Sequence, residues 1–97
     1  MKSNNEKKIK LQLDLSVSEL AYIVRILIEL GIAKNKSKAE VYSWCCENIA
    51  TKKAEDISFN AIKNKCNIPQ NISIIKVGKL IKEMYSLAMR DQYKYLS

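Results

Sequence analysis

The chain has 97 residues, enough for one small domain with a single hydrophobic core, and this excludes a two-domain enzyme or a large barrel. Apolar residues make up 47%, which is too many for a disordered chain, and only two glycines and one proline favour helices over an all-β fold. Seventeen Lys and Arg against ten acidic residues give a formal charge of +7. Such a charge fits a polyanionic partner such as nucleic acid, but it also fits a lysine-rich surface without one.

Several residue types and segments that carry chemistry are missing from the sequence. There is no histidine, the commonest general base and metal ligand. Cys45, Cys46 and Cys66 are odd in number and lack a Cys-x-x-Cys spacing, so we expect unreactive thiols, no metal site and no disulfide. The composition therefore predicts no enzyme activity, no cofactor and no evident small-molecule ligand. No apolar stretch is long enough to span a bilayer and no signal peptide is visible, so the expected location is the cytoplasm, without a membrane partner.

The first part of the chain predicts a tail and then a strand. Residues 1–8 are polar and basic and are expected to form a flexible tail, with residues 9–97 forming a single DNA-binding-like domain. Residues 9–15 alternate between apolar and polar, a period typical of a half-buried strand. This is the only clear strand, so its partner is either a weak strand later in the chain or a second molecule.

Two capping boxes, each a serine followed three residues later by a glutamate, open the first two helices. The first helix begins after Ser16 and is expected to run to Leu30, with Gly31 ending it. It is apolar on nearly every side, which predicts the central helix of the domain. The second helix is expected after Ser37, over residues 38–50. Its predicted buried side chains are Val41, Trp44, Cys45 and Ile49.

Two further helices are expected on either side of Pro69, which cannot lie inside a helix. The third is short, residues 59–66, and is capped by Ser58. The fourth runs from about Ser73 to Tyr95. Its apolar residues step by three and four, and we refer to them as the seam: Ile74, Val77, Ile81, Met84 and Ala88. The seam is expected to pack on the core, although it could also pair with another helix. The predicted fold is mainly α: one N-terminal strand and four helices, in a small domain of helix-turn-helix or winged-helix-like type with a long C-terminal helix.

The third helix gives the most specific functional prediction. Its expected outward face carries amides and a cation and no acid: Phe59, Asn60, Lys63, Asn64 and Asn67. Asparagine can bond an adenine edge in the major groove, and lysine can reach guanine or phosphate. Neighbouring lysines are candidates for phosphate contacts, including two near the start of the second helix, where a helix N-terminus attracts anions. The predicted DNA-binding residues are Lys36, Lys38, Lys52, Lys53, Ser58, Phe59, Asn60, Lys63, Asn64 and Lys65.

Four segments, residues 20–23, 31–41, 61–65 and 79–84, follow in an order that resembles the C-terminal region of the RteC family. That family comprises regulators associated with conjugative transposons of Bacteroides-type bacteria, and the resemblance covers about residues 17–91. It implies a winged-helix-like DNA-binding domain that acts in transcription of transfer or excision functions. The family is richer in arginine at its third helix, where this chain has Lys63 and Lys65, and it carries an additional N-terminal domain.

Two other readings remain open. The strand at residues 9–15 and the two helices after it also resemble a ribbon-helix-helix repressor, in which paired strands of a dimer enter the major groove. Lys8, Lys10 and Gln12 would then contact bases. Alternatively, the chain is a protein-interaction module that pairs through the strand edge or the seam, and the charge serves solubility. A homodimer is compatible with each of these readings.

Overall fold

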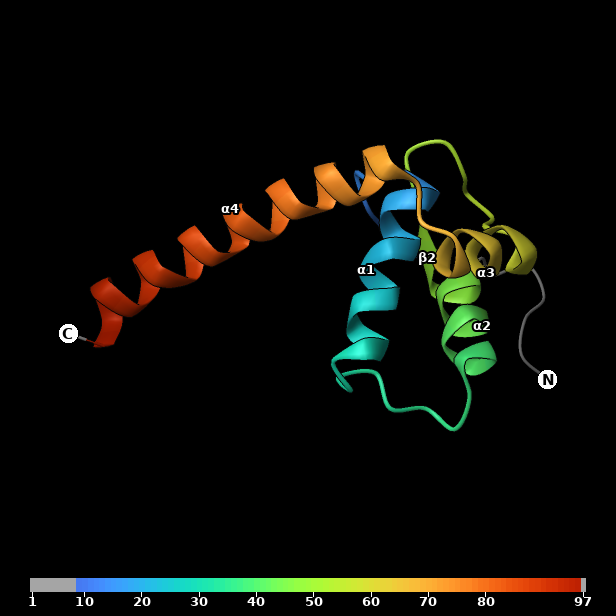
Figure 1. Cartoon of the computed structure of the whole chain (residues 1–97), viewed down its shortest axis with the longest axis horizontal. Helices are drawn as coiled ribbons and strands as arrows, with labels where there is room; N and C mark the ends of the chain where they lie inside the picture. Colours follow the sequence, from blue (N-terminus) through green and yellow to red (C-terminus); the bar gives the residue numbers. More distant parts are fainter. Residues whose placement is uncertain (1–8, 97) are drawn as a thin grey trace.

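The computed structural model describes residues 9–96, so the predicted tail at residues 1–8 lies outside the described part (Figure 1). As predicted, the fold is mainly helical, with four helices and a short strand region near the N-terminus. The elements in chain order are β1 (Leu11–Gln12), α1 (Val17–Glu29), α2 (Lys38–Asn48), β2 (Ile49–Ala50), α3 (Phe59–Asn67) and α4 (Asn71–Leu96). Among these described helices, none is long and apolar enough to cross a membrane.

Helix α1 begins and ends where its sequence predicts. The Ser16 hydroxyl accepts a hydrogen bond from the Glu19 N–H at 3.1 Å, and the Glu19 carboxylate accepts one from the Ser16 N–H at 2.9 Å. At the other end, Gly31 has φ +75°, and the Ile32 N–H donates to the Leu27 carbonyl at 2.9 Å. This is a Schellman ending, which satisfies carbonyls at the helix end and favours glycine because of the positive φ.

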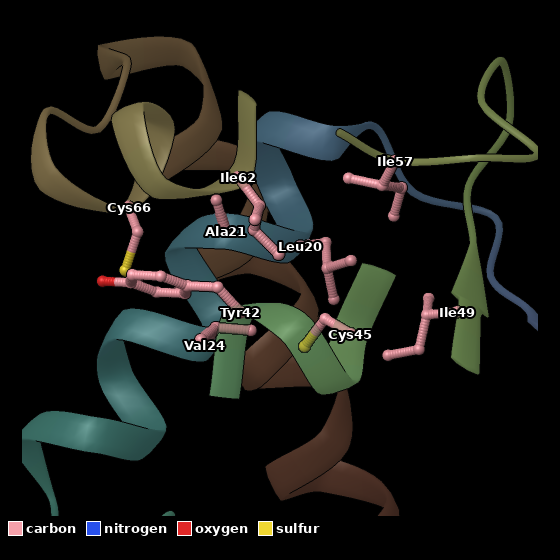
Figure 2. Close-up of a cluster of buried hydrophobic side chains, with 9 residues drawn as sticks. All are labelled: Leu20, Ala21, Val24, Tyr42, Cys45, Ile49, Ile57, Ile62 and Cys66. Carbon is pink, nitrogen blue, oxygen red and sulfur yellow. The ribbon is translucent and has the colours of Figure 1, made fainter. Parts of the chain in front are cut away.

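The core lies between α1, α2 and α3, and α1 is central because both α3 and α4 pack against it (Figure 1). Figure 2 shows the buried cluster, to which α1, α2, α3 and the β2 region contribute. The Tyr42 ring crosses this cluster and reaches toward Cys66 of α3. The buried residues of the cluster are Leu20, Ala21, Val24, Tyr42, Cys45, Ile49, Ile57, Ile62 and Cys66.

The predicted strand at residues 9–15 is only two residues long, and its partner lies within the chain. β1 pairs in parallel with β2, with Leu11 opposite Ile49 and Gln12 opposite Ala50. The pairing is short because helices limit both strands. β1 is soon followed by the Ser16 cap of α1, and β2 cannot begin before α2 ends at Asn48. Of the two possible partners, the structure therefore contains the weak strand later in the chain.

The buried side of α2 differs from the prediction. Trp44 was expected in the core but is 57% exposed, whereas Tyr42 is only 3% exposed. Tyr42 and Cys45 are three residues apart and share the side of α2 that faces α1 and α3. Val41 lies at the edge of that side and is half-buried. The helix predicted over residues 38–50 ends at Asn48, and Ile49 is buried from the extended backbone of β2. The predicted buried side is rotated by about one residue because an apolar pattern alone does not fix which of two aromatic residues, two positions apart, faces the core.

Helix α4 packs on the domain only at its beginning. Ser73 and Val77 are its buried residues, and the remainder projects away from the other helices (Figure 1). The prediction that the whole seam packs on the core is therefore wrong beyond Val77. The physical reason is length: α4 has 26 residues and α1 has 13, so at about 1.5 Å per residue α4 extends well past the helix against which it packs.

Candidate nucleic-acid interface

Helix α3 presents the polar face that the sequence predicts. Its first turn is fixed by Ser58, whose hydroxyl accepts a hydrogen bond from the Ala61 N–H at 3.1 Å. Ile62 and Cys66 are buried on the inner side of the helix. The opposite side therefore faces solvent, and its exposed residues are Asn60, Lys63, Asn64 and Asn67.

Three of the predicted α3-region residues have other roles or positions. Phe59 was expected on the outward face but is half-buried, and its ring packs edge-to-face on Tyr42 with 5.9 Å between ring centroids. The reason is spacing, since Phe59 lies three residues before Ile62 and so shares the inner side of α3. The Ser58 hydroxyl is used by its helix cap, and Lys65 is half-buried beside the exposed face.

Arg25 of α1 fixes the far end of α3, a role that the sequence reading missed. Its guanidinium donates to the carbonyl of Cys66 at 2.8 Å and to that of Asn67 at 3.2 Å, and it forms an ion pair with Glu29 at 3.0 Å. A cation at a helix C-terminus stabilises the helix because the last carbonyls lack partners and carry partial negative charge. Both ends of α3 are therefore fixed by specific contacts. The only hint of this role in the sequence is that Arg25 is the single basic residue of a mainly apolar helix.

The structure brings Lys38 close to α3. Lys38 and Asn67 line the same shallow hollow, so this lysine lies beside the C-terminal end of the exposed face. Lys36 is exposed in the preceding loop, and its N–H donates to the Glu40 carboxylate at 3.1 Å. The Glu40 N–H in turn donates to the Ser37 hydroxyl at 3.3 Å. The N-terminus of α2 thus already has a carboxylate. Of the two lysines, Lys38 is the better candidate for a phosphate contact because it lies beside α3.

Lys52 and Lys53 lie in a different place. They form the exposed turn after β2 and line a depression at the N-terminal ends of α1 and α4, together with Lys76. The Lys52 ammonium is 3.7 Å from Asp14, and Glu19 lines the same depression, so acids reduce its positive charge. The predicted lysines therefore form two groups: one beside the end of α3, and one where α1 and α4 begin.

Lys10, a base-contacting residue in the ribbon-helix-helix reading, is turned inward. Its ammonium donates to the carbonyls of Cys46 at 3.2 Å and Glu55 at 3.0 Å, and to the Asp56 carboxylate at 2.9 Å. The side chain is only 14% exposed. An ammonium has three donors, and all three are used here. The contacts of Lys10 therefore disfavour the ribbon-helix-helix hypothesis. Of its other two base-contacting residues, Gln12 is exposed and Lys8 lies outside the described residues.

The three cysteines are free thiols, with Cys45 and Cys66 buried. Burial raises the pKa of Cys45 to about 11, so this thiol stays protonated near neutral pH. Burial and a hydrogen bond with Cys66 raise the pKa of Tyr42 to about 12. Cys45 and Tyr42 therefore behave as neutral parts of the core.

The segment that contains α3 carries lysines and no acid, although Glu29 of α1 lies beside its C-terminal end. From Ile57 to Lys82 the sequence has five lysines and no acidic residue. No protein-family model, no curated protein and no solved structure matches this chain. The resemblance to the RteC family therefore stays a prediction. The observations that bear on function are the fold and the exposed face of α3.

Proposed function

We propose that this protein binds double-stranded DNA and inserts α3 into the major groove. The observation that carries the proposal is the exposed face of α3, where Asn60, Lys63 and Asn64 lie together on a helix that Ser58 and Arg25 fix at its two ends. A fixed helix favours recognition because less conformational freedom is lost on binding. Its amides suit adenine edges, and its lysine suits guanine or phosphate.

The dimensions and the surrounding lysines support this placement. An α-helix with its side chains is about 10–12 Å in diameter and the major groove is about 12 Å wide, so the groove can admit α3. The nine residues of α3 give about 13 Å of helix to lie in it. Lys38, at the C-terminal end of the face, would contact one phosphate strand. Lys52, Lys53 and Lys76 would contact phosphates farther from α3. Such contacts fix the register of the protein on the duplex but do not read its sequence.

The connection between α2 and α3 narrows the kind of DNA-binding fold proposed. Residues 49–58 join the two helices, which is longer than the turn of about 3–4 residues in a helix-turn-helix. Within residues 68–96, the structure describes only α4 after α3, with no strand that would form a wing there. We propose a helical reader in which α3 acts without a wing. We further propose a role in transcription regulation of mobile-element type because of the resemblance to the RteC family, and a cytoplasmic, non-enzymatic protein because of the residue types and segments that the sequence lacks.

A salt titration of binding to random-sequence duplex DNA tests the proposal. Log affinity should fall linearly with log salt, with a slope of about −0.9 for each phosphate contact. Lys38→Ala should make this slope shallower by about 0.9. Lys94→Ala removes the same charge at the far end of α4 and is the matched control, with the slope unchanged. Absent binding at low salt, or equal effects of the two variants, would contradict the proposal.

Sequence readout is tested on duplexes selected from a random pool by the unaltered protein. Asn64→Ala should weaken binding to a selected duplex by about 1–3 kcal/mol and leave random duplexes almost unaffected. Gln92→Ala, an exposed amide on α4, is the control and should change neither affinity. If Gln12→Ala alters the selected sequence while Asn64→Ala does not, the strand reads the bases and the proposal for α3 is wrong.

A further inference from the structure

A hollow between α1 and α4 is lined only by apolar side chains. Its two walls come from different helices. The α1 wall and the α4 wall each contribute three residues: Ile23, Ile26 and Leu27, and Leu80, Ile81 and Met84. No charged or polar side chain lines this hollow, which is unusual for an exposed surface of a basic protein.

A second apolar hollow, between α1 and α2, joins the first. Ile23 and Leu27 line both, so the apolar surface is continuous from α2 across α1 to α4. Val41 and Trp44 form its α2 side. The 57% exposure of Trp44, the only tryptophan, places a large apolar side chain at the rim of this surface. We call the whole region, from Trp44 across α1 to Met84, the α1 surface.

The far part of α4 has the shape and polarity to cover such a surface. The seam that buries Val77 continues through Ile81, Met84 and Ala88, and these residues lie on one side of the helix because they step by three and four. From residue 81 onward no residue of the described helix is buried. A helix gains most of its stability from packing of its apolar side, and among the described residues only the beginning of this part, at Ile81 and Met84, lies beside α1.

We propose that the chain forms a symmetric dimer in which the far part of α4 of each copy packs on the α1 surface of the other. The lengths agree, because residues 81–96 span about 24 Å of helix and α1 spans about 20 Å. A twofold arrangement uses the same two surfaces in both copies and closes without leaving either uncovered.

Charge supports pairing of the two α4 helices in opposite directions. Residues 71–82 contain three lysines and no acid, whereas residues 83–96 contain both acids of α4, Glu83 and Asp91. Asp91 also continues the three-and-four spacing of the seam. Residues 83–96 also contain Arg90 and Lys94 and are therefore neutral overall. An antiparallel pair places each neutral half against the partner's basic half and keeps the two basic halves apart, which is favourable.

The exposed apolar area is sufficient for a stable dimer. The large side chains on the two surfaces, at the exposures observed for them, amount to on the order of 800 Å² per copy, which matches a standard interface. Most of this area comes from side chains that are more than 40% exposed: Trp44, Ile81, Met84, Tyr85 and Tyr95.

The test compares Met84→Glu with Ser86→Glu by light scattering and by Trp44 fluorescence. Ser86 is exposed on the opposite side of α4, so both variants add one acid to the same helix. The unaltered chain and Ser86→Glu should have twice the 11.1 kDa chain mass at high concentration. Their Trp44 emission should shift to shorter wavelength as concentration rises. Met84→Glu should raise the dissociation constant by more than about tenfold and keep the emission of the monomer.

Circular dichroism separates dimer loss from misfolding, since α1 to α3 should melt as a folded unit in both variants. A chain that stays at the monomer mass at all concentrations would overturn the proposal. So would a dimer that Met84→Glu and Ser86→Glu weaken equally, or a dimer that forms without any change in Trp44 emission. None of these readouts involves DNA, so they are distinct from the tests of the proposed function.

Discussion

Helix α3 and the far part of α4 are both amphipathic, but only α3 has its apolar side covered within the chain. Ile62 of α3 is 0% exposed, whereas Ile81, the same residue type on the seam of α4, is 43% exposed. The nine residues of α3 are fixed by a serine cap, by Arg25 and by the core. In the described part of α4 from residue 81 onward, by contrast, no side chain is buried. The difference shows that an amphipathic pattern predicts a helix, whereas the neighbouring surfaces decide whether that helix is packed or remains available to a partner.

The strongest test of this comparison replaces one isoleucine in each helix. Ile62→Ala should lower the free energy of unfolding by about 2–5 kcal/mol, because it leaves a cavity in a packed core. Ile75→Ala should change it by no more than about 0.5 kcal/mol, because the side chain is exposed and lies off the seam. Urea denaturation followed by circular dichroism measures both. Similar losses in the two variants would show that α4 is covered on more sides than the structure indicates.

A second test compares two lysines, one turned inward and one exposed. Lys10→Ala should lower the free energy of unfolding by about 1–3 kcal/mol, because it leaves the Cys46 and Glu55 carbonyls without their donor. Lys63→Ala should change stability by no more than about 0.5 kcal/mol but should weaken DNA binding. Chemical denaturation and DNA titration of both variants check this. A stable Lys10→Ala protein with altered sequence preference would restore the ribbon-helix-helix reading.

The smallest expected effects come from the two glycines. Gly78 lies in α4, and a Cβ added there meets no atom within 4 Å. Gly78→Ala should therefore raise the free energy of unfolding by up to about 1 kcal/mol, since alanine favours helix. Gly31→Ala should lower it by about 1–2 kcal/mol, because Gly31 has a positive φ that disfavours a side chain. Thermal melts of both variants give the signs, and a stabilising Gly31→Ala would contradict the assigned turn.

The local features of the fold were largely predictable from sequence. Ser16, Ser37 and Ser58 each accept a hydrogen bond from a backbone N–H three residues later, and Gly31 ends α1. The outward position of Asn60, Lys63 and Asn64 followed from helical spacing alone. These features are accessible because caps and periodicity depend on residues within one or two turns.

Other features required the tertiary structure, because they depend on which surfaces meet. Whether Tyr42 or Trp44 faces the core depends on where α1 and α3 lie relative to α2. The inward turn of Lys10 depends on carbonyls more than thirty residues away in sequence. Arg25 became a cap for α3 only because α3 ends beside it.

For α4, the sequence determined that the chain forms a long amphipathic helix, because its seam repeats at helical spacing. Only the tertiary structure decided that the seam is covered no farther than Val77. The physical reason is geometric: α1 is half as long as α4, and the two helices diverge where α4 leaves the domain. No local pattern in a sequence records the length and direction of a neighbouring helix.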